Sequence, residues 1–165
     1  MNEIFTRVSI RRFEDRAVEK EKIEQILRAA MAAPSAGNQQ PWEFYVVTDA
    51  EKRAELAKAH QYAGPAAKAP VVLVPCVKRE GAMFPEMAET DLAIASENIL
   101  LEITSLGLGG VFLAISPVEQ RIANVRKALD ISDDLTPFAL IALGYAAESR
   151  KQEDRYDESR VHWCE

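Results

Sequence analysis

Two arginines and a serine near the N-terminus alternate with other residues in a pattern that suits phosphate binding. Arg7, Ser9 and Arg11 are spaced i, i+2 and i+4, so an extended segment places their side chains on one side. An arginine binds a phosphate dianion through two parallel hydrogen bonds, and a serine hydroxyl donates one more. The alternative is a solvated basic segment that pairs with the acidic residues Glu14 and Asp15. The spacing alone leaves both interpretations open.

A second stretch with the composition of a ligand-binding loop runs from Met31 to Trp42. It lies between an amphipathic segment and an apolar run, which predicts a connection between a helix and a strand. Pro34 ends the helix, because a proline inside a helix removes a hydrogen bond and clashes with the preceding turn. The next residues combine short side chains, permissive backbone and hydrogen-bonding groups: Ser35, Ala36, Gly37 and Asn38. Such a loop can approach a flat ligand closely, although an ordinary polar connection has the same composition.

Hydrophobic periodicity predicts the elements that must position these two stretches. Strands are expected at 42–47, 69–77, 111–115 and 136–145, and helices at 3–6, 19–31, 48–60 and 86–106. The run 69–77 is apolar throughout and is expected to be buried on both faces of a sheet. Thr48 and Ser116 have capping-box spacing to an acidic residue, so each is expected to start a helix. Pro117 would then occupy the first helical position.

Glycine and proline mark two of the connections. Residues 61–68 contain Gly64 and Pro65 and are expected to be irregular. The glycines at 107, 109 and 110 follow a helix, which predicts a helix C-cap. A glycine-rich phosphate loop would instead follow a strand and open a helix.

Composition indicates one globular α/β or α+β domain over residues 1–165. Of the 165 residues, 48% are hydrophobic and 28% are charged, which is typical of a folded chain with a substantial core. The net charge of −6 argues against a general nucleic-acid binder, because contact with phosphate backbones needs a basic surface. No apolar run reaches the ~20 residues that cross a bilayer, and the N-terminal residues lack the apolar region of a signal peptide.

The cysteines and histidines form no catalytic or metal-binding pattern. Cys76 and Cys164 lack metal-ligand spacing and are expected to be reduced thiols of a cytoplasmic protein. His60 and His162 are far apart in sequence and belong to no Ser-His-Asp set. Chemistry carried by a metal or by a protein nucleophile is therefore not expected.

Several motifs occur together in an order that resembles one enzyme family. They are Arg7-Val-Ser-Ile-Arg-Arg-Phe13, Ala33-Pro-Ser-Ala-Gly-Asn-Gln-Gln-Pro-Trp42, Asp91-Leu-Ala-Ile-Ala-Ser-Glu-Asn98, Ser105-Leu-Gly-Leu-Gly-Gly110, Leu143-Gly-Tyr145 and a late Arg155. With these, nearly the whole chain resembles the FMN-dependent nitroreductase family in its short form. The resemblance implies an α+β, three-layer α/β/α fold with a central mixed, mainly antiparallel sheet. It also implies a homodimer whose flavin site lies at the subunit interface.

The resemblance assigns cofactor contacts residue by residue. On one subunit, the FMN phosphate and ribityl chain would be held by Arg7, the backbone of Val8, Ser9, Arg11 and Arg155. On the other subunit, the flavin would be contacted by Pro34, Ser35, Ala36 and Asn38. Residues 112–115, including Leu113, would lie along the isoalloxazine, with the backbone N–H of Ala114 near flavin N5 and Gln61 near the ring edge. Two departures are Val8, where many relatives carry arginine, and the acidic pair Glu153 and Asp154 before Arg155.

The function implied is an NAD(P)H-dependent FMN oxidoreductase. NAD(P)H would give hydride to flavin N5 and leave, and a nitroaromatic, quinone or similar acceptor would take its place in a ping-pong cycle. A cofactor that carries the chemistry explains why the protein needs no acid/base couple of its own. Alternatives on the same fold are reductive dehalogenation and flavin fragmentation. From other classes, the chain could be a non-catalytic FMN carrier or sensor, or a cofactor-free interaction protein.

Two polar residues of the helix at 86–106 are interpreted as structural groups. Asp91 and Asn98 are expected to make hydrogen bonds at an interface and not to act as catalysts, because buried polar groups usually serve structure. Trp163, near the end of the chain, is expected to pack on the partner subunit.

Overall fold

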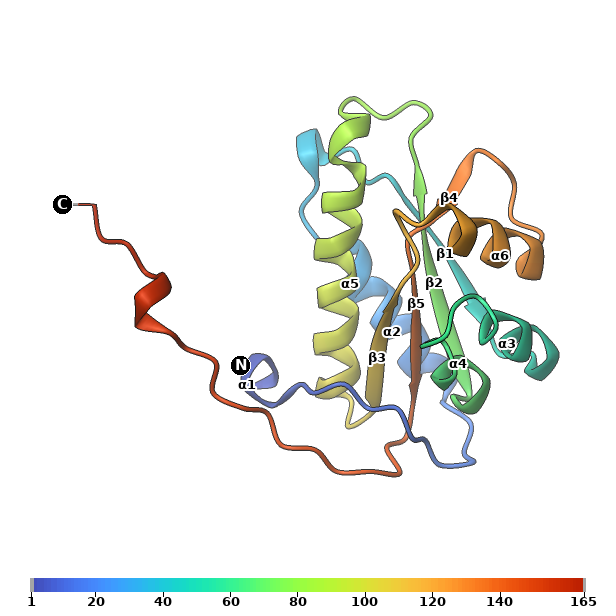
Figure 1. Ribbon diagram of the computed structural model, residues 1–165, viewed down its shortest axis with the longest axis horizontal. Coiled ribbons are helices and arrows are strands. Elements are labelled where there is room, and N and C mark those ends of the chain that lie inside the picture. Colours follow the sequence, from blue (N-terminus) through green and yellow to red (C-terminus); the bar gives the residue numbers. More distant parts are fainter. Residues whose placement is uncertain (1, 165) are drawn as a thin grey trace.

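A five-stranded sheet forms the middle layer of the molecule (Figure 1). The structure is a computed structural model, and it describes residues 2–164. The strands are β1 (Trp42–Val47), β2 (Val71–Lys78), β3 (Gly109–Ala114), β4 (Leu135–Pro137) and β5 (Ala139–Gly144). Their order is β1-β2-β5-β3, with β4 also pairing with β2, and each of these pairs is antiparallel. A parallel bridge between Ser9 and Gly110 adds the N-terminal segment to the open edge of β3.

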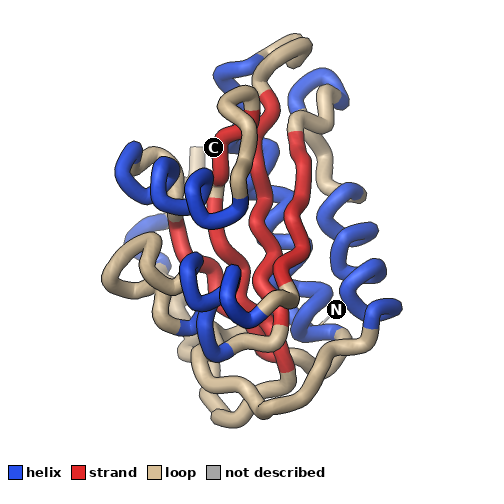
Figure 2. Tube along the Cα trace, turned by 90° about the vertical axis from the view of Figure 1, so that its right-hand side faces the viewer, coloured by secondary structure: helices blue, strands red, loops and turns tan. Residues whose placement is uncertain are grey.

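Helices cover both faces of this sheet (Figures 1 and 2). On one face pack α2 (Lys20–Met31) and α5 (Ala88–Ser105), with the short α1 (Glu3–Thr6) beside α5. On the other face lie α3 (Ala50–Leu56), α4 (Pro65–Lys68) and α6 (Glu119–Leu129), in front of the strands in Figure 2. This arrangement confirms the expected three-layer α/β/α fold.

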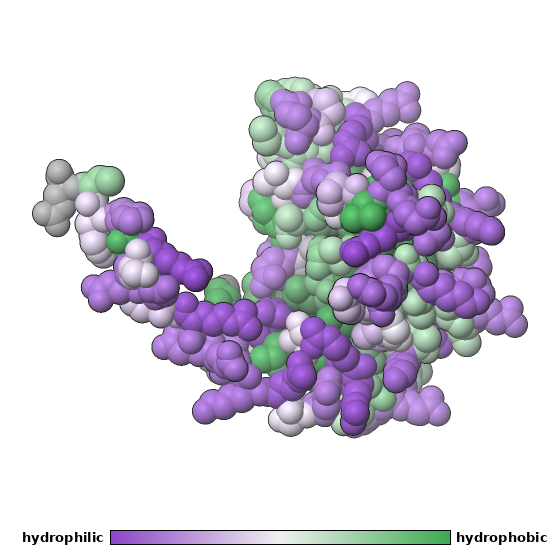
Figure 3. Space-filling model, viewed as in Figure 1, coloured by the Kyte–Doolittle hydropathy of each residue, from purple (hydrophilic) through white to green (hydrophobic). Residues whose placement is uncertain are grey.

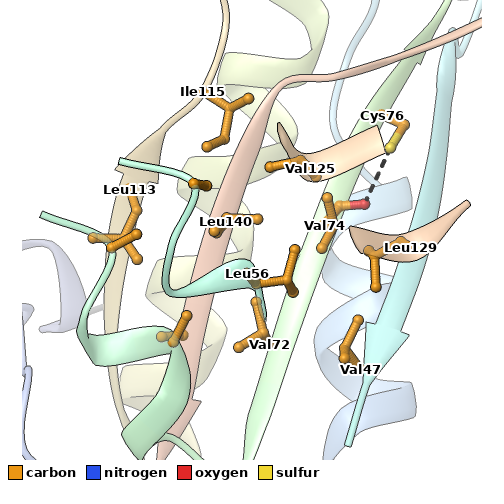
Figure 4. Packing of buried hydrophobic residues seen from close by; sticks show 14 of the residues in the cluster. Val47, Leu56, Val72, Val74, Cys76, Leu113, Ile115, Val125, Leu129 and Leu140 are labelled. Atoms are coloured by element: carbon orange, nitrogen blue, oxygen red, sulfur yellow. Dashed lines mark hydrogen bonds between the residues drawn. The ribbon is translucent and has the colours of Figure 1, made fainter. Parts of the chain in front are cut away.

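Strand β2 is buried on both faces, as its unbroken apolar run predicts. Val71 and Leu73 pack with α2 and α5, whereas Val72, Val74 and Cys76 face the opposite helices (Figure 4). The Cys76 thiol donates a hydrogen bond to the Val74 carbonyl at 3.6 Å. Burial raises the pKa of Cys76 to about 12, so the thiol is protonated at neutral pH and belongs to the core.

Helix α3 is capped by Asp49 and not by Thr48, which corrects the capping-box prediction. The Asp49 carboxylate accepts a hydrogen bond from the Lys52 N–H at 2.8 Å. An ionised carboxylate is a stronger acceptor than a hydroxyl, so the adjacent acidic residue takes the cap position. The helix ends at Leu56, before the expected end near residue 60. Residues 61–68, expected to be irregular, include α4.

The second capping-box prediction, at Ser116, is also wrong. The Ser116 hydroxyl donates to Oε1 of Glu89 at 2.9 Å, so it does not cap a helix. Helix α6 starts at Glu119, and Pro117 lies before it in the turn that follows β3. The same Glu89 oxygen accepts a hydrogen bond from Arg79 at 2.7 Å. A long-range carboxylate on α5 thus competes successfully for the local hydroxyl.

The expected strand at 136–145 is divided at Phe138 into β4 and β5. The Phe138 N–H donates to the Pro75 carbonyl of β2 at 2.8 Å. The Phe138 carbonyl accepts from the N–H of Ile115, the residue after β3, at 3.1 Å, so Phe138 connects β2 to the end of β3. Among the glycines predicted to cap α5, Gly107 ends the helix with a φ of 72°. The glycines at 109 and 110 instead begin β3.

After β5 the chain leaves the layers as an extended segment (Figures 1 and 3). We call residues 149–164 the C-terminal arm. Within it only Gln152 is half-buried, and the other side chains are exposed. In residues 2–164, no helix combines the length and apolarity needed to cross a bilayer.

Candidate functional site

Five basic residues from the two ends of the chain surround one pocket of about 480 Å³. Arg7 and Arg11 come from the N-terminal segment, and Arg150, Lys151 and Arg155 come from the C-terminal arm. We call this the cationic pocket; its other lining residues are Val8, Ser9, Gln152 and Glu153. The structure thus brings together the predicted phosphate-binding residues of the N-terminal segment and the predicted Arg155.

The charges of the cationic pocket are largely free to meet an anion. Arg7 pairs with Glu97 of α5 at 3.6 Å, and its side chain is 22% exposed. Among residues 2–164, no other cation of the pocket makes an ion pair, and neither Glu14 nor Asp15 pairs with the arginines. This arrangement favours the phosphate interpretation, because a doubly charged anion needs several unpaired donors.

The N-terminal segment is positioned by pairing with the edge of β3. The Ile10 N–H donates to the Gly110 carbonyl at 3.0 Å, and the Ile10 side chain is buried. Since side chains alternate along an extended segment, Ser9 and Arg11 point away from the core. Gly109 permits this close approach, because a Cβ there would lie 2.8 Å from the Cβ of Ile10.

We expect Gly109→Ala to lower the free energy of unfolding by about 2 kcal/mol, because the added methyl displaces Ile10 and overpacks the core. The matched control is Gly110→Ala, whose added methyl would lie 3.1 Å from Cδ1 of Ile103, the movable end of a side chain. Urea unfolding measures both variants. Equal losses would contradict the importance of the Ile10 contact.

A buried carboxylate on α5 fixes the loop of residues 34–40, which we call the Ser35 loop. Asp91 is 3% exposed and accepts hydrogen bonds from the Ala36 N–H at 2.9 Å and from the Gln39 amide at 2.7 Å. The loop contains a 3-10 turn, Ala36–Asn38, in which Gly37 has a φ of 56°. A Cβ on Gly37 would lie 2.8 Å from the ring of Phe84, so glycine is required there for space as well as conformation.

The predicted ligand-binding groups of the Ser35 loop are half-buried or exposed. Ser35 and Ala36 are half-buried, whereas Pro34 and Asn38 are exposed. The Ser35 hydroxyl oxygen accepts a hydrogen bond from the backbone N–H of Gln40 at 3.0 Å. The side-chain oxygen Oδ1 of Asn38 accepts one from the side-chain amide of Gln40 at 2.9 Å. Within the described residues, the Ser35 O–H and the Asn38 NH2 donate to no protein group, so both can donate to a ligand.

Asp91 and Asn98 make structural hydrogen bonds within the chain, and their predicted place at an interface stays a prediction. Asp91 holds the Ser35 loop, as described above. The Asn98 amide donates to the Ala29 carbonyl of α2 at 3.0 Å. Both residues therefore link α5 to neighbouring parts of the same subunit.

One chain does not bring the Ser35 loop and the cationic pocket together. Asp91, near the start of α5, contacts the loop, whereas the N-terminal segment bridges to Gly110, just beyond the end of α5 (Figure 1). Helix α5 has 18 residues. At 1.5 Å per residue, Asp91 lies about 9 Å along the helix from Glu97, which pairs with Arg7, and about 21 Å from the last helical residue, Ser105.

The end of β3 offers backbone groups at an open sheet edge. Because Gly110 accepts a hydrogen bond from Ile10 at this edge, Phe112 and Ala114, two and four residues later, turn their backbone groups the same way. The Ala114 carbonyl accepts from Arg121 at 2.9 Å. The Leu113 side chain, by contrast, is 6% exposed and packs in the core, so it is not available to a ligand.

Thiol and imidazole groups are not gathered around the pocket. Cys164 is exposed on the C-terminal arm, far along the chain from the buried Cys76. His60 is half-buried, and desolvation, together with the positive charge of Arg121, lowers its pKa. Residues 2–164 contain no group of three or more His, Cys, Asp or Glu that could hold a metal ion.

Comparison with known proteins identifies the family of this chain. The model of the nitroreductase family matches residues 4–76 and 60–145. The chain belongs to the nitroreductase family. A relative from Methanothermobacter thermautotrophicus, provisionally named NADH dehydrogenase/NAD(P)H nitroreductase, is 40% identical over 159 residues, which are 96% of this chain and 83% of the relative.

Solved structures of similar proteins have the same fold. A protein from Clostridium acetobutylicum, provisionally described as an NADH oxidase, superposes with a TM-score of 0.94 at 45% identity and covers 97% of each chain. A nitroreductase from Desulfovibrio desulfuricans, provisionally so described and solved in complex with FMN, superposes with a TM-score of 0.86 at 31% identity. That comparison covers 99% of this chain and 95% of the other.

Three groups at the site of this nitroreductase-family chain were not expected from its sequence. Arg150 and Lys151 line the cationic pocket beside the expected Arg155, and the basic character of this stretch is the signal that could have indicated them. Gln39 holds the Ser35 loop by bonding to Asp91 and to the backbone of Phe84. These Gln39 contacts join residues distant in sequence, and no local pattern indicates them.

Proposed function

We propose that this chain is an NAD(P)H-dependent oxidoreductase with FMN as its cofactor and a nitroaromatic, quinone or similar acceptor as its substrate. The nitroreductase family, the names of its relatives and the FMN-bound neighbour support this assignment. The observation that carries it is the cationic pocket, where Ser9 converges with four cations that have no ion-pair partner among residues 2–164. When bound, FMN would supply hydride transfer from NAD(P)H to the acceptor in a ping-pong cycle.

The donors of the pocket fit the phosphate end of FMN. Arg7, Arg11 and Arg155 would neutralise the phosphate, and the Ser9 hydroxyl would donate one hydrogen bond. At the other end of the site, the backbone N–H of Ala114 at the edge of β3 would donate toward flavin N5. A fixed N–H donor stabilises negative charge on a bound ring without needing to reorganise.

The proposal includes a homodimer in which each flavin site uses both subunits. The Ser35 loop lies near the start of α5, whereas the cationic pocket lies beside its second half, where Arg7 pairs with Glu97, so a second copy would be needed to bring a loop to each pocket. Large apolar side chains are exposed on α5 and on the C-terminal arm, with Ile94 38%, Tyr156 73% and Trp163 82% exposed. A second subunit that packs on α5 and the arm would remove these side chains from water.

We also propose the cytoplasm as the location of this enzyme. Cys76 and Cys164 are both free thiols in the structure. Proteins that keep unpaired thiols are common in reducing compartments, which supports this location.

Anaerobic reduction tests the proposed activity. We expect NADPH or NADH to bleach the absorbance of the FMN-loaded protein near ~450 nm, because hydride transfer reduces the ring. Addition of a nitroaromatic or a quinone should restore the absorbance. Free FMN at the same concentration is the control for uncatalysed reduction. A protein that binds FMN but bleaches no faster than this control would be a flavin carrier and not a reductase.

A further inference from the structure

Glu148 lies between the two chain segments that build the cationic pocket. Its Oε1 accepts hydrogen bonds from the backbone N–H of Arg11 at 2.6 Å and of Arg12 at 3.2 Å. A carboxylate so close to a phosphate-binding pocket would ordinarily weaken the binding of an anion by repulsion. Here the carboxylate instead bonds to the backbone of the segment that carries Arg11.

The contacts around Glu148 form a short pairing between the two chain ends. The Glu14 N–H donates to the Tyr145 carbonyl at 2.9 Å, and the Ala147 N–H donates to the Arg12 carbonyl at 3.0 Å. An antiparallel bridge between Phe13 and Ala146 lies between these bonds. The pairing ends at Glu148, immediately before the C-terminal arm begins.

Beyond Glu148 few hydrogen bonds attach the described part of the arm to the rest of the chain. Among the described residues, its only hydrogen bond back to residues outside the arm runs from the Gln152 amide to the Ile4 carbonyl at 3.1 Å. Its other hydrogen bonds join residues within the arm, such as those between Asp157 and Ser159. The location of Arg150 and Arg155 therefore depends on how firmly the chain is held at Glu148.

We propose that Glu148 is a positioning residue for phosphate binding. Its carboxylate holds the N-terminal segment, which carries Arg11, against the start of the C-terminal arm. It sets the spacing between Arg11 on one side of the pocket and Arg150 and Arg155 on the other. The assignment of the ligand as the FMN phosphate rests on the proposed function. The tie itself rests on the two hydrogen bonds.

Electrostatics supports this role. The hydrogen bond from the Arg11 N–H, followed by that from Arg12 and the nearby positive charge of Arg150, lowers the pKa of Glu148. The carboxylate is thus ionised at neutral pH, and its bonds to the two N–H groups are charge-assisted.

The test compares three variants for FMN binding by titration of the apoprotein, followed by flavin fluorescence. We expect Glu148→Ala to raise the Kd for FMN at least about tenfold, because the pocket loses a charge-assisted tie. Glu148→Gln retains an acceptor oxygen and should recover most of that affinity. The matched control is Asp15→Ala, which removes an exposed carboxylate of the N-terminal segment that does not line the pocket and should leave FMN binding unchanged. The Kd for riboflavin, which lacks the phosphate, should change little in all three.

The rate of limited trypsin digestion tests whether Glu148 holds the C-terminal arm, and this test does not need the cofactor. Glu148→Ala should be cleaved faster after Arg150 and Lys151, while Asp15→Ala is cleaved like the wild type. Glu148→Ala and Asp15→Ala with the same FMN affinity and the same cleavage rate would overturn the positioning role. A wild-type protein that takes up no FMN would overturn the proposed function, and the cleavage rates would still decide whether Glu148 holds the arm.

Discussion

Arg11→Ala will weaken FMN binding by about 10- to 100-fold, which corresponds to the loss of a charge-assisted hydrogen-bonding partner worth about 1.5–3 kcal/mol. Arg11 lines the cationic pocket and makes no ion pair among the described residues, so its charge is available to the phosphate. Its guanidinium makes a long hydrogen bond of 3.5 Å to the Ser9 carbonyl. Truncation therefore costs the fold one long hydrogen bond, whereas the pocket loses a positive charge that is available to the phosphate.

The matched control is Arg12→Ala, which removes the same charge from the adjacent residue. Arg12 is exposed and does not line the pocket. The dissociation constants of FMN and riboflavin for both variants should be measured at low and high salt. We expect the Arg11 effect to be confined to FMN and to shrink as salt screens the charges. Equal losses for the two variants would show that only the net charge of the segment matters.

Local patterns in the sequence predicted that the N-terminal segment brings its arginines and serine together, and these residues line one pocket. Arg7, Ser9 and Arg11 share one side because alternation in an extended chain is a property of neighbouring residues. The unbroken apolar run of β2 likewise predicted burial on both faces, since each residue needs only its own hydrophobicity to be assigned. Such features depend only on residues that are close together in the sequence, so local patterns are enough to predict them.

Features that depend on distant partners were beyond these patterns. Ser116 has the spacing of a helix cap, but Glu89, far away in sequence, takes its hydroxyl. Asp91 was recognised as a structural group, yet its partner, the Ser35 loop of the same chain, was not predictable from spacing. No pattern in the sequence indicated the role of Glu148, because Arg11, whose N–H donates to its carboxylate, is at the opposite end of the chain. Knowledge of the fold is needed to bring each of these pairs together.

Mixing two variants that each bind FMN poorly will restore FMN binding if each site is shared between subunits. Arg11→Ala damages the cationic pocket, and Asp91→Ala releases the Ser35 loop by removing the acceptor of two hydrogen bonds. We expect each homodimer to be poorly loaded at an FMN concentration that saturates the wild type. In a mixed dimer, the undamaged pocket of one subunit meets the undamaged loop of the other, which gives one intact site.

Random exchange of equal amounts makes about half of the dimers mixed, so about one quarter of the wild-type sites should return. Co-expression of the two variants under different affinity tags, followed by recovery through both tags in turn, isolates the mixed dimers, in which about half of the sites should bind flavin. Urea unfolding of the Asp91→Ala protein checks that the loop and not the fold is lost. If pocket and loop served a ligand within one chain, every site in the mixture would carry one defect and no binding would return. The recovery therefore distinguishes a site shared by two subunits from a site that each subunit builds alone.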